Sequence, residues 1–174
     1  SGYAKTQPLD EYREQRRGGQ GKAAASVKEE DLIQNLYVLS SHVQILCFTT
    51  KGKVFWLKVY EIPVASRTSK GRPLVNMLNL DDDERVSEIL PVEEFSDDKF
   101  IFMATRKGIT KKTNLSLFAR KWKSGIKAIN LDEDDRLVGT AITDGKKEIL
   151  LASSAGKLIR FNETKVRAMG RTAR

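Results

Sequence analysis

Short apolar runs alternate with polar turns along the whole chain. The longest runs are VQILCFTT (43–50), KVFWLKVY (53–60) and KFIFMAT (99–105), which are rich in β-branched and aromatic residues. That composition is typical of β-strands. Shorter runs of the same kind are LYVLS (36–40), RLVGTAI (136–142) and EILLASS (148–154). Because no segment shows the sustained 3.6-residue periodicity of an amphipathic helix, the pattern predicts an all-β protein.

Glycines and short polar segments join these runs. TTKGK and SSAGK place Gly52 and Gly156 between apolar runs, where a tight hairpin turn needs a residue that tolerates a positive φ. Two other segments, PLDEY (8–12) and NLSLFA (114–119), predict single helical turns.

The same order of features returns four times. A glycine opens each repeat, an apolar side chain follows ten residues later, and a basic cluster then precedes a second glycine. The opening glycines are Gly2, Gly52, Gly108 and Gly156, at intervals of 50, 56 and 48 residues, and the second glycines are Gly21, Gly71, Gly125 and Gly170. Around four strands in a repeat of about 50 residues suits a propeller blade. We therefore expect one array of four-stranded blades, with approximate boundaries at 1–42, 43–98, 99–147 and 148–174.

A single blade cannot bury both of its faces, so such repeats are stacked or closed into a ring. The first repeat lacks the acidic turn and strands that precede the other opening glycines, and the last lacks what should follow its basic cluster. We expect the outer two blades to be incomplete and the chain to be a piece of a larger array.

Composition narrows the class of protein. The chain has 174 residues, 40% of them hydrophobic, and a single cysteine, which suits one domain with a buried thiol and no disulfide framework. It contains no apolar run of about 18 residues and no signal-peptide pattern. These features predict a soluble protein of the cytosol that has no contact with a membrane.

The formal net charge of +8 is unevenly distributed. Acidic stretches separate four basic blocks with net charges of +3, +5, +8 and +5, namely residues 1–28, 51–73, 106–127 and 156–174. A basic surface that recurs with each repeat favours a polyanionic partner such as a nucleic acid. Since no helix presents Arg, Asn or Gln to a groove, we expect binding to the phosphate backbone without readout of bases.

The first basic block contains QRRGGQGKA (15–23), which has no apolar side chain larger than alanine. It is not a nucleotide phosphate loop, because Arg16 stands at the first glycine position, Ala23 at the hydroxyl position, and no apolar strand leads into it. Its bare N–H groups and fixed positive charges suit a diffuse polyanion. A solvated basic turn is the alternative interpretation.

The sequence offers little for catalysis or metal binding. His42 is the only histidine, which removes most catalytic triads and nearly all zinc sites. The acidic turns 81–84 and 132–135 lack the glycine and terminal glutamate of a calcium loop, so we interpret them as solvated turns. We expect no catalytic site, no metal, no cofactor and no small-molecule substrate in this chain. Trp122, between two lysines, is interpreted as surface packing with a role in stacking as the alternative.

Several segments resemble the C-terminal domain of the DNA gyrase A subunit: GYAKTQPLDEYREQRRGGQGK, KGRPLVNML, FMATRKGITKKT and VRAMGRTAR. Gln15 to Gly21 is similar to the GyrA box of that family, a Gln-basic-Arg-Gly-Gly-basic-Gly pattern. Gln20 departs from it, although Lys22 retains a charge nearby. The resemblance implies a β-pinwheel, a six-bladed array whose blades exchange strands, of which this chain would be about the first half. The box favours gyrase, and the related C-terminal domain of topoisomerase IV remains an alternative.

The resemblance also implies a function. In the family, duplex DNA bends around a basic rim, and the wrap gives negative supercoiling its direction. The chain would be a non-catalytic part of an ATP-dependent type II topoisomerase. Its partners would be double-stranded DNA, the rest of gyrase A and the gyrase B subunit in an A2B2 holoenzyme, with ATP and Mg²⁺ bound elsewhere, in the bacterial cytoplasm at the nucleoid. The alternative from another class is a propeller-like scaffold for protein–protein interaction.

The residues expected to contact DNA fall into four groups. The first group is the box, namely Gln15, Arg16, Arg17, Gly18, Gly19, Gln20, Gly21 and Lys22. The second arc of the rim would be Lys51, Lys53, Arg67, Lys70 and Arg72. The third would be Arg106, Lys107, Lys111, Lys112, Arg120, Lys121, Lys123 and Lys127, and the fourth would begin with Arg160, Arg167 and Arg171.

Overall fold

A computed structural model describes residues 2–12, 17–21, 33–66 and 68–173, and in these ranges the regular elements are β-strands and single-turn 3-10 helices. No helix in the described ranges is long and apolar enough to cross a membrane. The all-β prediction is confirmed. The hairpin glycines have the expected positive φ, 74° at Gly52 and 76° at Gly156. The two expected helical turns form at η1 (Leu9–Glu11) and η4 (Leu115–Phe118).

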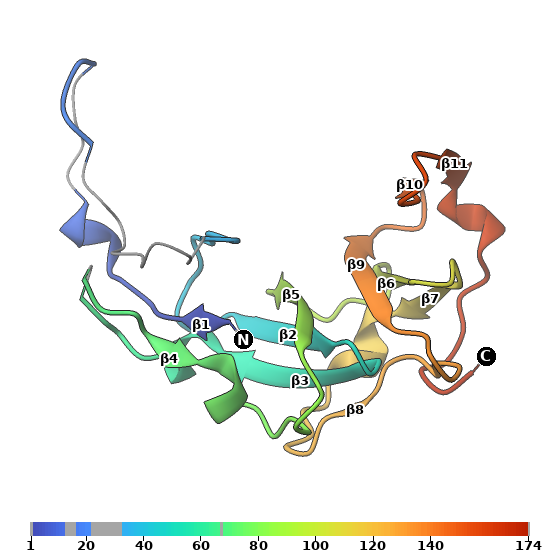
Figure 1. The fold of residues 1–174 in the computed structure, drawn as a ribbon, viewed down its shortest axis with the longest axis horizontal. Helices are drawn as coiled ribbons and strands as arrows, with labels where there is room; N and C mark the ends of the chain where they lie inside the picture. Colours follow the sequence, from blue (N-terminus) through green and yellow to red (C-terminus); the bar gives the residue numbers. More distant parts are fainter. Residues whose placement is uncertain (1, 13–16, 22–32, 67, 174) are drawn as a thin grey trace.

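The strands of the described residues form four antiparallel sheets that follow one another along the long axis in Figure 1. The first sheet pairs β1 (Tyr3–Ala4) with β4 (Arg72–Pro73). The second has the order β5-β2-β3-β8, with bounds Val86–Val92, Gln44–Thr49, Lys53–Lys58 and Ile126–Lys127. The third has the order β7-β6-β9, with bounds Thr110–Asn114, Phe100–Thr105 and Leu137–Thr143. The fourth pairs β10 (Glu148–Ala152) with β11 (Leu158–Asn162).

Neighbouring sheets exchange strands. β8 lies between β7 and β9 in the sequence, yet it pairs with β3 of the preceding sheet, Lys53 opposite Lys127 and Val54 opposite Ile126. In the same way β4, which follows β3, pairs back with β1. A third contact of this kind is the bridge between Lys112 and Ala168. We call each sheet, with the segment that follows its hairpin, a unit. The second, third and fourth units therefore each send a short segment back to the sheet before them, as expected for a β-pinwheel. We call residues 59–73 and 115–127 the crossover segments.

The second sheet is buried on both faces. One face packs Leu46, Phe48 and Trp56 against residues of the third unit, including Ile101 and Phe118. The opposite face carries a second core cluster: Ile45, Cys47, Phe55, Leu57, Leu74 and Leu78. This double burial explains why the runs 43–50 and 53–60 are apolar without alternation, since neither face of β2 or β3 meets water.

Two expectations about strands need correction. The run 36–40 is not a strand: Leu36 and Val38 are exposed, and only Leu39 packs against a core cluster. Conversely, β5 was not among the predicted strands, because Pro91 and two polar residues interrupt its apolar pattern. Proline is tolerated there because β5 is the edge strand of its sheet.

Candidate nucleic-acid interface

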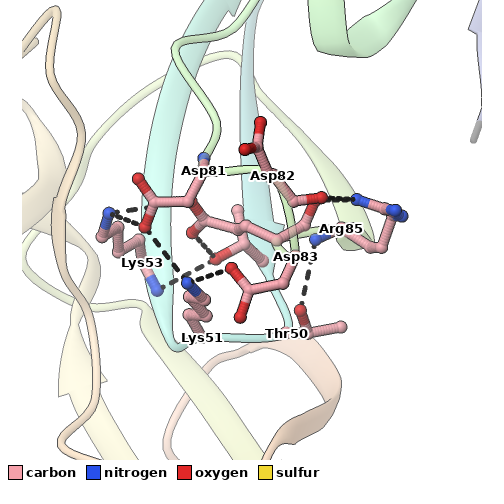
Figure 2. A network of polar contacts seen from close by, with 9 residues as sticks. Thr50, Lys51, Lys53, Asp81, Asp82, Asp83 and Arg85 are labelled. Carbon is pink, nitrogen blue, oxygen red and sulfur yellow. Dashed lines mark hydrogen bonds and ion pairs between the residues drawn. The ribbon is translucent and has the colours of Figure 1, made fainter.

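Lys51 and Lys53, the first two cations predicted for the second arc of the rim, lie at the β2–β3 hairpin and contact an acidic turn (Figure 2). The Nζ of Lys51 is 3.3 Å from Asp81 Oδ2 and also pairs with Asp83. The Nζ of Lys53 is 3.2 Å from the same Asp81 oxygen and 3.6 Å from Glu84 Oε2. Lys53 and Lys51 hold the pKa of Asp81 below its usual value, and Lys51 does the same for Asp83. The protein's own carboxylates thus already neutralise these two lysines.

A buried carboxylate fixes this acidic turn in place. Glu84 is fully buried, and its Oε1 accepts a hydrogen bond from the hydroxyl of Thr49. Its Oε2 accepts the backbone N–H of Asp81 at 3.2 Å. The Thr49 hydroxyl in turn accepts the N–H of Lys53, which closes the hairpin. The interpretation of residues 81–84 as a solvated turn is therefore wrong at Glu84, although the three aspartates before it are exposed.

The β6–β7 hairpin also lies against an acidic turn, although its basic side chains donate to backbone carbonyl oxygens and not to carboxylates. Arg106 donates to the carbonyl oxygen of Asp134 at 3.0 Å, and Lys107 Nζ donates to that of Glu133 at 2.8 Å. The Asp135 carboxylate accepts the N–H of Lys107 at 3.1 Å. In both units, then, the acidic turn of the repeat folds onto the basic tip of its own hairpin.

Lys111 and Lys112 were expected on the rim, and the structure contradicts this. They are only 2% and 6% exposed. Lys111 Nζ donates to backbone carbonyl oxygens of Ala128, Arg171 and Ala173, and burial, with the charge of Arg171, lowers its pKa.

Lys112 Nζ lies 3.7 Å from the fully buried Glu163 carboxylate and donates to the Glu163 carbonyl oxygen at 3.1 Å. Both lysines therefore join the third unit to the fourth and are withdrawn from any surface that a phosphate could reach.

The crossover segments carry several exposed cations. Among the described residues no carboxylate forms an ion pair with Arg72, Arg120, Lys123 or Lys127. Lys121 pairs with Glu61 of the other crossover segment at 3.4 Å. The Nζ of Lys70 lies 4.3 Å from the centre of the Tyr3 ring. Lys127 is an exposed residue of β8 directly opposite Lys53.

Tight backbone packing holds each crossover segment against the sheet that it joins. Gly71 and Gly125 have positive φ values of 85° and 70°. A Cβ on Gly71 would lie 2.5 Å from the carbonyl oxygen of Ala4, and one on Gly125 would lie 2.7 Å from the Phe55 ring. Lys5 adds hydrogen bonds to the carbonyl oxygens of Ser66 and Ser69 at 3.0 and 2.9 Å. At Gly71 and Gly125 a glycine is thus needed where the chain crosses between sheets.

The box is described only in part. Arg17, Gly18, Gly19, Gln20 and Gly21 are all exposed, and this short segment lies apart from the sheets (Figure 1). A Cβ on Gly18 or Gly21 would meet no atom within 4 Å. Gln15, Arg16, Lys22 and Arg67 lie outside the described residues.

The three arginines predicted for the fourth arc of the rim differ in their exposure. Arg160 is exposed, and its Nε lies 3.6 Å from Glu148. Exposed Arg167 is 3.9 Å from the sulfur of Met169, while Arg171 is half-buried beside Lys111.

Sequence reasoning missed the polar residues that build these contacts, namely Thr49, Glu84, Glu61 and Lys5. A usable signal was present in the hairpins. Thr49, Thr105 and Ser153 each stand three residues before an opening glycine, and each hydroxyl accepts the N–H four residues further on.

Taken together, strand-exchanged antiparallel sheets with exposed basic crossovers define a propeller-type domain of the pinwheel kind. The chain belongs to the DNA gyrase C-terminal domain, beta-propeller family, whose model matches residues 1–40, 44–93, 99–144 and 147–174. The DNA gyrase A protein of Aeromonas salmonicida is 56% identical over 162 residues, which are 93% of this chain and 18% of that protein. The DNA gyrase A protein of Haemophilus influenzae is 53% identical over 172 residues, 99% of this chain and 20% of that protein.

Among solved structures, the C-terminal domain of DNA topoisomerase IV superposes with a TM-score of 0.83 at 28% identity. The match covers 99% of this chain and 52% of that chain. The chain spans about a fifth of the length of the curated relatives it matches.

Proposed function

We propose that this chain is the DNA-binding and DNA-wrapping part of a gyrase A protein, and that duplex DNA follows the exposed cations of the box and the crossover segments. The single observation that carries the proposal is the recurrence of such cations on consecutive crossovers. Arg72 stands on the first, and Arg120 and Lys123 stand on the second, without carboxylate partners among the described residues.

The fixed geometry of the crossovers supports wrapping as well as binding. Bending duplex DNA costs several kcal/mol, which many phosphate contacts must offset. Cations on rigid segments lose little conformational freedom when they bind a phosphate. More of the free energy of each contact is therefore available to offset the cost of bending the DNA. Because two consecutive units each contribute one crossover segment, the contacts recur at the spacing of the sheets and can follow a continuous duplex.

The rest of the proposal concerns the whole enzyme. The chain has no catalytic role of its own. It acts with the remainder of gyrase A and with gyrase B in a type II topoisomerase of the bacterial cytoplasm, where ATP and Mg²⁺ bind to other parts of the assembly. The wrap would present a nearby DNA segment to the cleavage site with one handedness.

A salt titration with two duplex lengths tests this proposal. We expect this chain to bind a duplex of about 150 base pairs more tightly than one of about 20, independent of sequence. The logarithm of the binding constant should fall with log salt at about −0.9 per phosphate contacted. The double variant R72A/K123A should reduce that slope by about 1.8.

K99A is the matched control, because Lys99 is an exposed lysine outside the crossover segments. Its salt slope should equal that of the unaltered chain. A flat salt response, or equal losses per charge in K99A and in the crossover variant, would contradict the proposal.

A further inference from the structure

The second crossover segment presents an exposed indole among cations. Trp122 is 39% exposed, whereas the other tryptophan, Trp56, is 4% exposed and donates its Nε1–H to the carbonyl oxygen of Phe118 at 2.8 Å. Lys121 and Lys123 flank Trp122 in the sequence. An indole that packs into a core would not show this exposure, so part of its apolar surface is available to a partner.

The cation nearest to the indole is stacked on it. The guanidinium carbon of Arg120 lies 4.3 Å from the centre of the Trp122 ring. The planar guanidinium is held by this stacking while its N–H groups stay available at the edge, which suits a phosphate oxygen. The first crossover segment has a similar pair, since Lys70 lies 4.3 Å from the centre of the half-exposed Tyr3 ring.

The backbone below this pair is fixed at several points. The N–H of Gly125 donates to the carbonyl oxygen of Trp122 at 3.1 Å and closes a turn. Gly125 itself is packed against the buried ring of Phe55. On the other side, Trp56 holds the Phe118 carbonyl, and Lys121 pairs with Glu61. The indole and the guanidinium therefore project from a rigid turn.

We infer that Trp122 and Arg120 form one composite contact with the DNA backbone, in which the indole packs against deoxyribose while the stacked guanidinium binds the adjacent phosphate. This inference rests on the proposed function and adds an apolar component to it. An apolar contact releases no counterion, so its contribution to affinity is insensitive to salt, unlike that of a lysine.

Intrinsic fluorescence tests the contact in the unaltered chain, because it contains two tryptophans and only Trp122 is exposed. Adding unlabelled duplex DNA of about 150 base pairs should protect the exposed indole from quenching by acrylamide, a neutral quencher. W122F is the control, because its remaining signal comes from Trp56 and should not respond to DNA.

Affinity measurements separate the two components. W122A should weaken binding about tenfold at every salt concentration and leave the salt slope unchanged. K123A should instead reduce the slope by about 0.9. R120K, which keeps the charge and loses the planar stack, should lie between W122A and the unaltered chain in affinity.

The outcomes distinguish the two proposals. Loss of all salt-dependent DNA binding in the unaltered chain overturns the proposed function and this inference with it. Normal DNA binding with an indole that acrylamide still reaches overturns this inference alone. So does a W122A variant whose affinity is unchanged, or whose salt slope falls as it does in K123A.

Discussion

Gly125 packs directly against the ring of Phe55. A Cβ on Gly125 would lie 2.7 Å from two carbon atoms of that ring, and its φ of 70° is one that other residues rarely adopt. Phe55 belongs to the core cluster on the face of the second sheet that packs against Leu74 and Leu78. The ring cannot move without disturbing that packing, so the crossover is anchored at a point where only glycine fits.

Gly125→Ala should destabilise the fold by about 2 kcal/mol or more, since it adds a steric clash to an unfavourable backbone conformation. Gly108→Ala is the matched control. Gly108 has a φ of 85°, but a Cβ there would meet no atom within 4 Å, so only the backbone cost of about 1 kcal/mol applies. Urea unfolding midpoints measure both, and equal losses would show that the clash with Phe55 has no energetic weight.

Lys112→Met should lower the stability of the fold, whereas the DNA affinity of the folded variant should not change. The substitution leaves the fully buried Glu163 carboxylate without its ion-pair partner 3.7 Å away. Breaking a buried pair from one side costs about 3 kcal/mol. The double variant K112M/E163Q should recover part of this loss, because no unpaired charge remains buried. A stable K112M variant that binds DNA weakly would instead restore Lys112 to the DNA-binding surface.

Neutralising the acidic turn should strengthen DNA binding. In D81N/D83N, Lys51 loses both of its ion-pair partners, whereas Lys53 loses Asp81 and keeps Glu84 at 3.6 Å. Lys51 then becomes available to phosphates and Lys53 in part, so the salt slope should steepen by between about 0.9 and about 1.8. D97N/D98N changes the net charge equally at exposed acids that form no ion pair within the described part of the chain. If both double variants bind alike, only net charge matters and the turn does not compete with DNA.

Ionisation of Cys47 should lower the free energy of unfolding at alkaline pH. Burial raises the pKa of this thiol from 9.0 to about 12. A pKa that is higher in the folded state means that the unfolded state releases the proton first. The thiol's contribution to the free energy of unfolding is therefore complete below about pH 9 and is lost as the pH rises towards 12. Since lysines and tyrosines also titrate there, the measurement is the difference in unfolding free energy between the unaltered chain and C47A, which should shrink over this range.

The sequence predicted the strands whose pattern is local. The runs 43–50 and 53–60 are long, apolar and joined by a glycine turn, so β2 and β3 follow from composition and from the φ that Gly52 adopts. The two-residue strands β4 and β8 could not be found this way. A strand of two residues has no periodicity, and its partner lies in another unit.

The rim predictions show the same limit. Lys111 and Lys112 belong to a basic run that looks solvent-facing, and what buries them is Glu163 and carbonyl groups around residues 171–173. Lys51 is neutralised by aspartates thirty and more residues away in the sequence. Charge counting locates basic segments, but only the tertiary fold shows which cations already have a partner.

Strand exchange also has a consequence for the order of synthesis. A ribosome completes the β2–β3 hairpin well before it reaches β8, the strand that pairs with the free edge of β3. At about 5–20 residues per second, that edge stays open for roughly several seconds. Each blade is thus completed backwards, by the unit made after it, and the newest blade of a nascent chain always presents one unpaired edge. Neighbouring ribosomes on one messenger RNA would hold such edges close together, so slow translation of the segment between residues 58 and 126 should favour pairing between chains.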